Sequence, residues 1–168
     1  MKVEVKVANI VKQEDIQVVV NSANANLRLG SGVAGAIHGA AGIKLEKYCE
    51  QFAPIALGQA IMTPAFNLPN EFVIHTRAAN YLLDDNAEAV LVECLNGVFA
   101  LANENKITSL AIPAIGTGVF KFPLEMCAAI MAREIKANEG GSVELVRICV
   151  TDDAVAAVFL AALSAEGV

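Results

Sequence analysis

The hydrophobic residues of this chain fall into short runs and stripes whose spacing alternates between that of strands and that of helices. From Val3 to Val7, valine alternates with charged residues, which is the period of a strand with one exposed face, either at a sheet edge or in an outer hairpin. The run Val18 to Val20 is consecutive and β-branched, as in a strand that is buried on both faces. Four further strands are predicted at Ala60 to Thr63, Phe72 to Thr76, Ser109 to Ile112 and Leu145 to Val150.

Stripes with helical spacing lie between these strands. One helix is expected to begin near Val33, and a second is expected to run from Ile43 to Phe52, where Pro54 stops it. Strands that alternate with helices imply a largely parallel sheet that is covered on both faces. We therefore predict an α/β fold, a three-layer α/β/α sandwich, and a single domain over residues 1–168, because this length is typical of one domain.

Three more helices have recognisable starting residues. Asp85 and Glu88 have the spacing of a capping box. The helix that they would open carries an apolar stripe at Val90, Leu91, Cys94, Val98, Leu101 and Ala102. Pro123 is expected at the first turn of the next helix, and either Asp152 or Asp153 is expected to cap the last one.

The most distinctive stretch follows the buried strand and runs to Gly42. Asn21, Ser22, Asn24 and Asn26 stand where the strand would end, and their side chains can donate and accept hydrogen bonds without adding charge. Gly30, Gly32 and Gly35 follow, and they would let the main chain approach a ligand closely. The helix that begins here offers unpaired N–H groups and the positive end of its dipole. This stretch therefore favours an anionic group such as phosphate.

Two other interpretations compete for this stretch. Glycines and asparagines are also ordinary loop residues, and Ala34 to Gly42 would then be a tightly packed helix. The residues from Gly30 to Gly35 also match the dinucleotide fingerprint G-x-G-x-x-G, but that motif needs its glycine turn directly after the strand and an acidic residue about 20 positions on. Here Ser22 to Leu29 intervene, and Glu50 lies in a helical pattern. The dinucleotide interpretation is therefore rejected.

A second glycine loop, Pro113 to Lys121, follows another predicted strand. In open α/β sheets, ligands lie beyond the carboxyl ends of the strands, where both loops are expected. Two loops of the phosphate-binding kind predict a ligand with a diphosphate.

These motifs, in this order, resemble the macro domain family, whose members bind ADP-ribose. The resemblance covers nearly the whole chain: Asn21-Ser-Ala-Asn24, Gly30 to Val33, Ala36-Ile-His38 with Ala40 to Gly42, Asn67-Leu-Pro69, Val73-Ile-His75, and Pro113 to Phe120 with Pro123. It implies the macro domain fold, in which the central sheet is mixed and largely parallel. It also implies that the two glycine loops hold the two phosphates of ADP-ribose.

The resemblance also implies a set of site residues. Asn24 takes the position that orients the distal ribose, and it would be the catalytic position if the chain is an enzyme. The other implied ligand-binding residues are Asn9, Ile10, Gly30, Ser31, Gly32, Val33, Gly116, Thr117, Gly118, Val119 and Phe120. Phe120 is expected near the distal ribose, although a loop aromatic can also pack back on the sheet. No metal and no cofactor are expected.

Three positions depart from the family pattern. An Asp that recognises the adenine amino group is common where this chain has Asn9, and an aromatic residue is common where it has Thr151. Base selectivity is therefore expected to be relaxed. In the branch that removes ADP-ribose from proteins or deacetylates O-acetyl-ADP-ribose, an Asp that helps to activate water is usual where this chain has Ala34. Without this carboxylate, no general base is evident in the loop.

Several side chains that often carry chemistry are assigned to the core instead. His38 and His75 are expected to be satisfied core residues, and Asn21 is expected to be structural. The four cysteines show no C-x-x-C spacing, and Cys94, Cys127 and Cys149 fall on apolar positions, where cysteine acts as a small buried hydrophobe. Neither a disulfide nor a metal site is predicted.

Composition narrows the classes of partner. The mean hydropathy of +0.52 is high, but no apolar run approaches the ~20 residues of a membrane helix, and the sequence MKVEVKV has no apolar signal core. A cytoplasmic protein without membrane contact is expected. The net charge of −6 and the pI near 4.9 argue against a nucleic-acid surface, which would need a basic stripe. A small anionic ligand remains possible, because local N–H groups can bind it.

Three functions follow from these observations. The leading hypothesis is a module that binds ADP-ribose, an ADP-ribose derivative or an ADP-ribosylated protein, with weak processing activity possible. The alternative enzyme is a mono-ADP-ribosyl hydrolase or O-acetyl-ADP-ribose deacetylase, which Asn24 favours and Ala34 disfavours. The third hypothesis is a module for another nucleotide or for RNA, which Asn9 and Thr151 allow and the acidic charge opposes.

Overall fold

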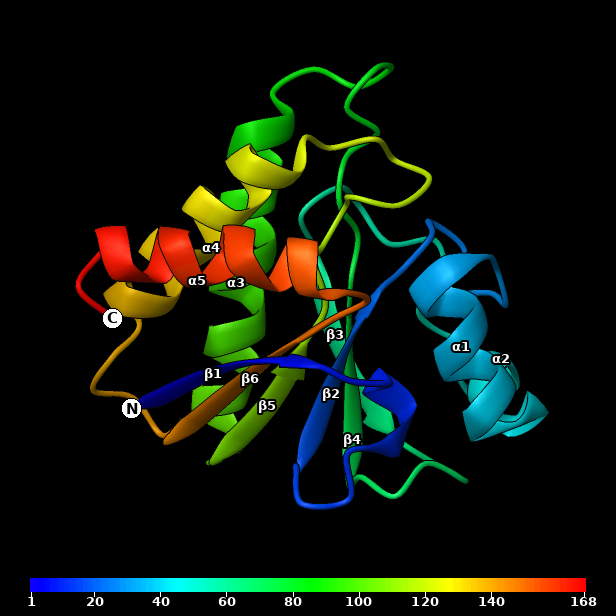
Figure 1. Ribbon diagram of the computed structural model, residues 1–168. Helices are drawn as coiled ribbons and strands as arrows, with labels where there is room; N and C mark the ends of the chain where they lie inside the picture. The colour runs from blue at the N-terminus through cyan, green and yellow to red at the C-terminus, as the bar shows by residue number, and fades with distance from the viewer.

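A six-stranded sheet crosses the centre of the molecule in the computed structural model, which describes all residues from Met1 to Val168 (Figure 1). Its strands are β1 (Lys2–Val7), β2 (Val18–Ser22), β3 (Ala60–Pro64), β4 (Phe72–Thr76), β5 (Ser109–Ile112) and β6 (Leu145–Val150). They lie in the order β1-β6-β5-β2-β4-β3, and all pairs are parallel except that of β3 with β4. The predicted mixed, largely parallel sheet is confirmed. β1 is an edge strand and not part of a hairpin.

Helices cover both faces of this sheet, which makes the predicted three-layer sandwich (Figure 1). One face carries α3 (Ala87–Glu104), α4 (Leu124–Ala137) and α5 (Asp153–Ala165). The other face carries the short 3-10 helix η1 (Ile10–Lys12), α1 (Gly32–Ala41) and α2 (Ile43–Cys49). No helix is both long enough and apolar enough to cross a membrane.

The run of valines in β2 explains why both layers are stable. Val18 and Val20 belong to the core under α3, α4 and α5, whereas Val19 belongs to the core under α1 and α2, and all three are fully buried. Successive side chains of a strand point to opposite faces, so a continuous apolar run supplies both cores. Each buried valine contributes roughly 1.5–3 kcal/mol relative to an exposed one. β2 is thereby held at the middle of the molecule.

Two predicted helix boundaries were wrong. The capping box is absent, because α3 begins after Asn86, which has a left-handed backbone (φ 57°), and no side chain caps the helix. Asp84, which precedes the predicted cap Asp85, bonds within the preceding loop, where its Oδ2 accepts a hydrogen bond from the N–H of Asn80 at 2.8 Å. α2 ends at Cys49 and not at Phe52, because the chain turns there, with the N–H of Phe52 bonded to the Cys49 carbonyl at 2.9 Å.

The starts of the last two helices agree more closely with those predicted from the sequence. Pro123 is the residue just before α4 rather than its first residue. Of the two candidate caps for α5, Asp152 is the one used, since its Oδ1 accepts from the N–H of Val155 at 2.9 Å. All four cysteines are buried free thiols, as predicted for Cys94, Cys127 and Cys149.

Candidate functional site

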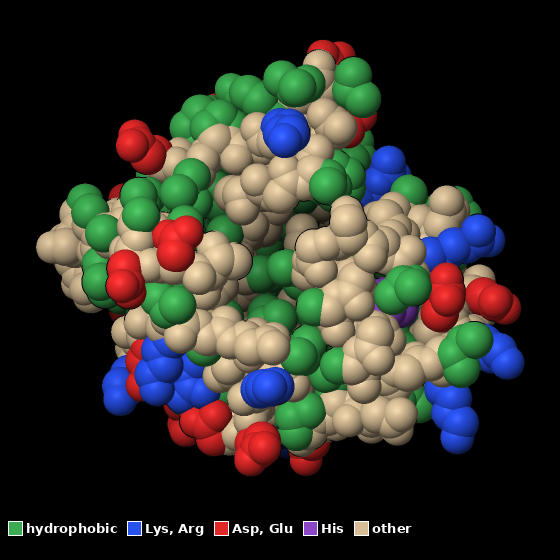
Figure 2. Space-filling model, turned by 45° about the vertical axis from the view of Figure 1, so that its right-hand side comes forward, with side chains coloured by type: hydrophobic (Ala, Val, Ile, Leu, Met, Phe, Trp, Pro, Cys, Tyr) green, Lys and Arg blue, Asp and Glu red, His purple; other side chains and the backbone are tan.

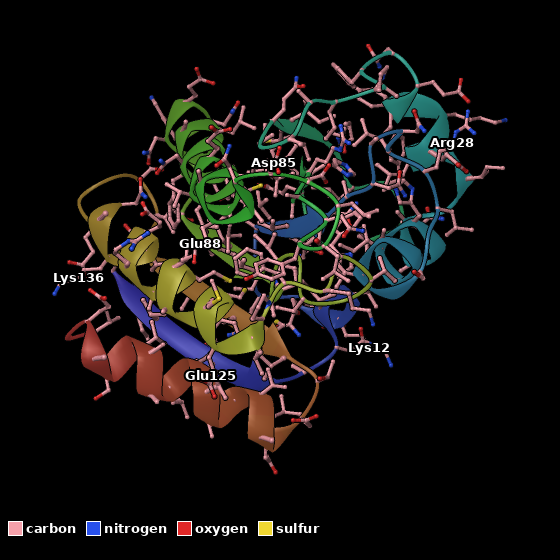
Figure 3. The ribbon with its side chains drawn as sticks, turned by 90° about the horizontal axis from the view of Figure 1, so that it is seen from above. Lys12, Arg28, Asp85, Glu88, Glu125 and Lys136 are labelled. Atoms are coloured by element: carbon pink, nitrogen blue, oxygen red, sulfur yellow. The ribbon has the colours of Figure 1, made fainter.

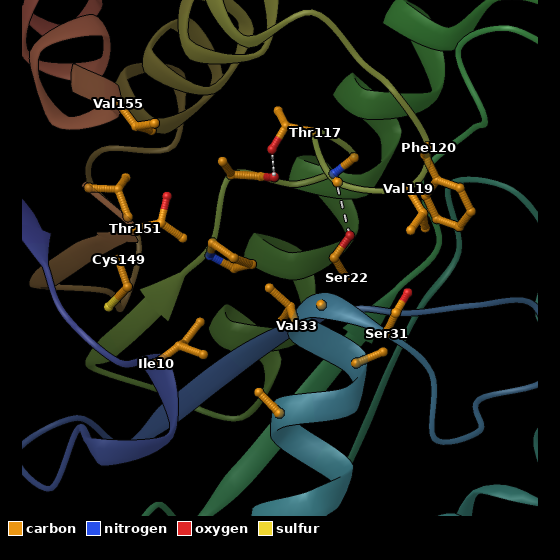
Figure 4. A pocket seen from close by; sticks show the side chains of 18 of the residues that line it. Ile10, Ser22, Ser31, Val33, Thr117, Val119, Phe120, Cys149, Thr151 and Val155 are labelled. Carbon is orange, nitrogen blue, oxygen red and sulfur yellow. Dashed lines mark hydrogen bonds between the residues drawn. The ribbon is translucent and has the colours of Figure 1, made fainter. Parts of the chain in front are cut away.

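A cavity of about 1060 Å³ lies at the carboxyl ends of β1, β2, β5 and β6. Figure 2 shows it as a hollow with an uncharged floor, and Figure 4 shows it from close by. It is lined by Val7, Ala8, Asn9, Ile10, Ser22, Asn24, Gly30, Ser31, Gly32, Val33, Ala34, Ala36, Pro113, Ala114, Gly116, Thr117, Gly118, Val119, Phe120, Leu124, Cys149, Val150, Thr151 and Val155. The parallel strands bring these segments together because their ends meet at one edge of the sheet.

The lining of this cavity carries no charged side chain. None of its 24 residues is Asp, Glu, Lys, Arg or His, although the whole chain has a net charge of −6. The one titratable side chain is the thiol of Cys149, and burial raises its pKa to about 11. Any anion that binds here must therefore be held by main-chain N–H groups and neutral side chains.

The first set of such donors is the start of α1. The N–H groups of Gly32, Val33 and Ala34 donate to no protein acceptor, as expected for the first turn of a helix. Gly32 has a positive φ of 58°, a conformation that glycine adopts without strain. The helix dipole adds partial positive charge at this end, an arrangement that favours an anionic group beside the three donors.

The second set of donors belongs to the loop after β5. The N–H groups of Gly118, Val119 and Phe120 also donate to no protein acceptor. The loop is closed at its base by the hydrogen bond from the N–H of Phe122 to the Gly116 carbonyl, at 2.9 Å. Its shape is therefore fixed while its tip keeps free donors. Two sets of free N–H groups line one cavity, as the two glycine loops predicted.

Ser22 joins the two sides of the cavity. Its Oγ accepts a hydrogen bond from the N–H of Gly116 at 3.4 Å, which links the end of β2 to the second glycine loop (Figure 4). Thr117 turns its hydroxyl back to the Ala114 carbonyl at 2.8 Å. These bonds tie the loop to the sheet, so the second donor set has a fixed position relative to the first.

The cavity has two chemically different ends, seen in Figure 4. Ile10, Thr151 and Val155 line one end, which is largely aliphatic. Val119 and Phe120, at the tip of the second glycine loop, lie at the other end, and Val33 and Thr117 lie between the two ends. An elongated ligand with an apolar ring at one end and an anionic middle would match this order.

Asn24 lines the cavity, but most of its amide is already occupied. Its Nδ2 donates to the Arg28 carbonyl at 2.8 Å, and its Oδ1 accepts from the Arg28 N–H at 2.9 Å. These bonds close a tight turn in which Leu27 has a positive φ of 55°. One amide hydrogen and one lone pair remain for a ligand. Asn24 therefore shapes the loop in addition to facing the cavity.

Asn9 is held at the aliphatic end by a chain of hydrogen bonds. Its carbonyl accepts from Nε2 of Gln13 at 2.8 Å, and Oε1 of Gln13 accepts from the Arg147 guanidinium at 2.9 Å. Arg147 is buried and makes two bonds to the Asp15 carboxylate, at 2.7 and 2.8 Å, which lower the pKa of Asp15 to about 2. The Asn9 side chain is exposed and caps η1 through the N–H of Val11.

The two histidines lie in the core beside this site, and only one has partners. His75 bonds through Nδ1 to Asn21 Nδ2 at 3.0 Å and through Nε2 to Thr63 Oγ1 at 3.0 Å. Burial lowers its pKa to about 3, so it is neutral, and the amide donor indicates the tautomer with hydrogen on Nε2. Asn21 is structural, as predicted. The expectation of a satisfied core residue was wrong for His38, because both its ring nitrogens are buried without a partner.

The ligand-binding residues predicted from the sequence make up 12 of the 24 residues that line the cavity. Each predicted ligand-binding residue lines it: Asn9, Ile10, Asn24, Gly30, Ser31, Gly32, Val33, Gly116, Thr117, Gly118, Val119 and Phe120. That they contact a ligand stays a prediction. Val155 and Cys149 also line the cavity, but each lies on an apolar stripe that is indistinguishable from core in the sequence. Ser22 lines the cavity as well, and it is not among the site residues that the resemblance implies.

Comparison with known proteins identifies the family. The macro domain family model matches residues 20–131, which include both glycine loops. The chain belongs to the macro domain family. A macro domain-containing protein of Chlorobaculum tepidum is 38% identical over 141 residues, which cover 82% of each chain. A Lactiplantibacillus plantarum macro domain-containing protein is 35% identical over 168 residues, covering 97% of this chain and 98% of the relative.

Solved macrodomains have the same architecture. The structure of the Oceanobacillus iheyensis macrodomain with ADP superposes with a TM-score of 0.92 at 31% identity, covering 99% of this chain and 93% of that one. The Trypanosoma brucei macrodomain in complex with ADP-ribose gives a TM-score of 0.84 at 25% identity, over 94% of this chain and 67% of that one. The family and the fold class predicted from the sequence are both confirmed.

Proposed function

We propose that this macro domain binds ADP-ribose, or the ADP-ribosyl group of a modified molecule, in the cavity at the carboxyl edge of the sheet. The observation that carries the proposal is the pair of free donor sets, Gly32 to Ala34 and Gly118 to Phe120, which line one uncharged cavity. Each set suits one phosphate of a diphosphate, because main-chain N–H groups bind phosphate without a cationic side chain.

The size of the cavity and the ligands of related proteins support this ligand. Small-molecule sites typically measure roughly 300–1,000 Å³, and the cavity of about 1060 Å³ suits a large, elongated ligand. The Oceanobacillus iheyensis macrodomain was solved with ADP, and the Trypanosoma brucei macrodomain was solved in complex with ADP-ribose. Both ligands contain adenosine and a diphosphate.

The aliphatic end is the site that we assign to adenine. Ile10 and Val155 offer apolar contact there, and no aromatic side chain lines this end for stacking. Asn9 can accept from the adenine amino group with the remaining lone pair of its Oδ1. A neutral acceptor discriminates less strongly than a carboxylate, because charge-assisted hydrogen bonds are about twice as strong. The base preference is therefore weaker than a carboxylate at this position would give.

The proposal is for binding, with slow hydrolysis at most. A water molecule in the cavity would find no carboxylate or imidazole to take its proton, and position 34, at the start of α1, is an alanine. Hydrolysis by this site would depend on groups of the substrate itself. Asn24 can orient the ribose beyond the diphosphate through its one free amide hydrogen.

We extend the proposal to the biological setting. Residues 1–168 form a single macro domain, because both apolar cores share the β2 strand of one sheet. The physiological partners are proteins that carry ADP-ribose. The four free thiols fit a reducing compartment such as the cytoplasm, where disulfides are rare.

Titration calorimetry with ADP-ribose, ADP, AMP and NAD in parallel tests the proposal. ADP-ribose and ADP should bind, and AMP, which has one phosphate, should bind more weakly. Gly118→Glu should abolish binding, because position 118 is open enough for the side chain but brings a negative charge beside the phosphate donors. Gly39→Glu is the matched control: position 39 is equally open and lies outside the cavity. Equal binding of ADP-ribose by both variants would refute the diphosphate model.

A further inference from the structure

One group of large apolar side chains is exposed on the second glycine loop and on the loop that is bonded to it. Leu82 and Leu83 are 74% and 83% exposed in the loop between β4 and α3, and Tyr81 beside them is 36% exposed. Val119, at the tip of the second glycine loop, is 64% exposed. We call these four residues the rim patch. Scattered exposed apolar residues are common, but such a group is typical of an interaction surface.

A main-chain hydrogen bond joins the two loops that form the rim patch. The N–H of Tyr81 donates to the Phe120 carbonyl at 2.8 Å, and the Tyr81 ring packs edge-on against Phe122 with ring centres 5.3 Å apart. Figure 1 shows the two loops side by side above the sheet, green for the first and yellow for the second. The patch is therefore continuous with the rim of the ligand cavity.

The leucines are held in the exposed position by their own loop. Oδ1 of Asn80 accepts from the N–H of Leu82 at 3.0 Å, and the N–H groups of Asn80 and Asp84 are also bonded within the loop. The turn thus presents Leu82 and Leu83 outward as part of its folded shape. Such a rigid apolar turn loses little conformational entropy when a partner covers it.

The position of the patch along the cavity indicates what would cover it. Ile10 and Val155 line the end that we assign to adenine, and Val119 and Phe120 line the opposite end (Figure 4). A ligand with adenine at the first end and phosphates on the glycine loops directs its distal ribose toward the second end. A protein attached to this ribose would leave the cavity beside the rim patch.

The charges around the patch indicate the chemistry of this protein. Asp84 and Asp85 follow the leucines, and Glu88 stands in the first turn of α3 (Figure 3). Lys121 is the one exposed cation of these two loops, because Arg77 is only half-exposed and its guanidinium donates to the Ile55 carbonyl at 2.9 Å. The surroundings of the patch are therefore acidic, and they attract a segment that carries Lys or Arg.

We propose that the rim patch binds the protein part of an ADP-ribosylated substrate, at a segment with apolar side chains and Lys or Arg near the modified residue. This inference builds on the proposed function and adds a second contact surface to the same site. The cavity holds the ADP-ribosyl group, and the patch selects among the proteins that carry it. Affinity for such a protein then exceeds the affinity for free ADP-ribose.

The test compares two ligands on the same variants. The first ligand is free ADP-ribose, and the second is a mono-ADP-ribosylated peptide with leucine and arginine next to the modified residue. The double variant Leu82→Ser and Leu83→Ser should bind free ADP-ribose as the wild type does and bind the peptide roughly tenfold more weakly or worse, since two apolar anchors are lost. Leu160→Ser, which changes a leucine that is 55% exposed on α5, should affect neither ligand.

The possible outcomes separate the two proposals. If the wild type does not bind free ADP-ribose, the proposed function fails. If the wild type binds ADP-ribose and the double variant weakens both ligands equally, the loop only supports the cavity and the inference about the patch is overturned. A dimer in sedimentation equilibrium that the double variant dissociates would show that a second copy covers the patch, which also overturns it. Loss of peptide affinity alone, in a monomer, supports it.

Discussion

The main chains of Gly35 and Gly30 lie in close contact, and a Cβ atom at position 35 would overlap the Gly30 carbonyl oxygen. This close approach lets the loop before α1 fold over the first turn of the helix, beside the free donors of Gly32 to Ala34. Glycine is required here for space and not for a positive φ. The packing of one glycine on another thus fixes the position of the first anion site.

Gly35→Ala should therefore displace the loop and lower the affinity for ADP-ribose roughly tenfold or more, because the Gly30 carbonyl must move away. Gly39→Ala is the matched control one helical turn later, where an added Cβ meets nothing within 4 Å. It should leave affinity unchanged and raise the free energy of unfolding by about 1 kcal/mol, the helix propensity of alanine over glycine. Calorimetry and urea denaturation measure both quantities. Equal affinity of the two variants would contradict this role of Gly35.

Asn9→Asp should sharpen the preference for adenine. The exposed side chain already accepts from the N–H of Val11 at 3.2 Å, and a carboxylate can keep that bond while it accepts from the base. Converting a neutral bond into a charge-assisted one contributes about 1 kcal/mol, or roughly a fivefold change in relative affinity. Affinities for ADP-ribose and its hypoxanthine analogue give the ratio directly. An unchanged ratio would show that Asn9 does not read the base.

Ala34→Asp tests the link between the first turn of α1 and turnover. We expect the wild type to release mono-ADP-ribose from a modified protein slowly, and Asn24→Ala to abolish this release because the ribose loses its orientation. A correctly placed general base typically contributes about 10²-fold to 10⁴-fold, so Ala34→Asp should accelerate single-turnover hydrolysis. Affinity is measured in parallel, because a carboxylate that faces the cavity can also repel the diphosphate. Rapid hydrolysis by the wild type would refute this account.

Acid should destabilise this protein through its histidines. Burial, and secondarily His38, lower the pKa of His75 to about 3, whereas an unfolded histidine titrates near 6.5. Between these values the unfolded chain binds a proton that the folded chain does not, so stability falls as the pH decreases from about 6.5 toward 3. For His75 alone, the loss from pH 7 to pH 5 is about 2 kcal/mol.

Urea denaturation at a series of pH values measures this loss. The chain has two histidines, and burial lowers the pKa of His38 as well, so the interval from pH 7 to pH 5 reports on these residues. The Asp15 carboxylate, whose pKa is about 2, affects stability only at lower pH. His75→Gln should flatten the profile. A wild-type stability that stays constant between pH 7 and pH 5 would exclude buried neutral histidines.

The periodicity of apolar residues in the sequence was sufficient to predict the strands of the sheet. The run Val18 to Val20 predicted a strand buried on both faces, and its side chains indeed alternate between the two cores. The start of α3 could not be predicted in this way. Asn86 adopts a left-handed backbone because the loop before it is closed by bonds among Asn80, Leu82 and Asp84, which depend on the folded shape of that loop.

The candidate site also has features that the sequence could predict and features that it could not. The glycine loops could be located because their ligand groups are main-chain donors, and glycine spacing reveals a main chain that is free to approach a ligand. The pairing of Asn24 with Arg28 was missed, since an amide after a strand has the same sequence pattern whether it faces a ligand or closes its own turn. The unpartnered ring of His38 was missed because a lone histidine on an apolar helix face does not reveal its neighbours.

The main-chain origin of the six free donors has a consequence for how this site tolerates mutation. Every amino acid except proline supplies the same N–H group, so most single-codon changes at Val33, Ala34 or Val119 leave the donor itself in place. At the aliphatic end and on the rim, the contacts are made by side chains, so single-codon changes at those positions alter the contacts themselves. Under the proposed function, recognition of the base and of the attached protein can therefore diverge between descendants of this sequence while the capacity to hold a diphosphate is inherited.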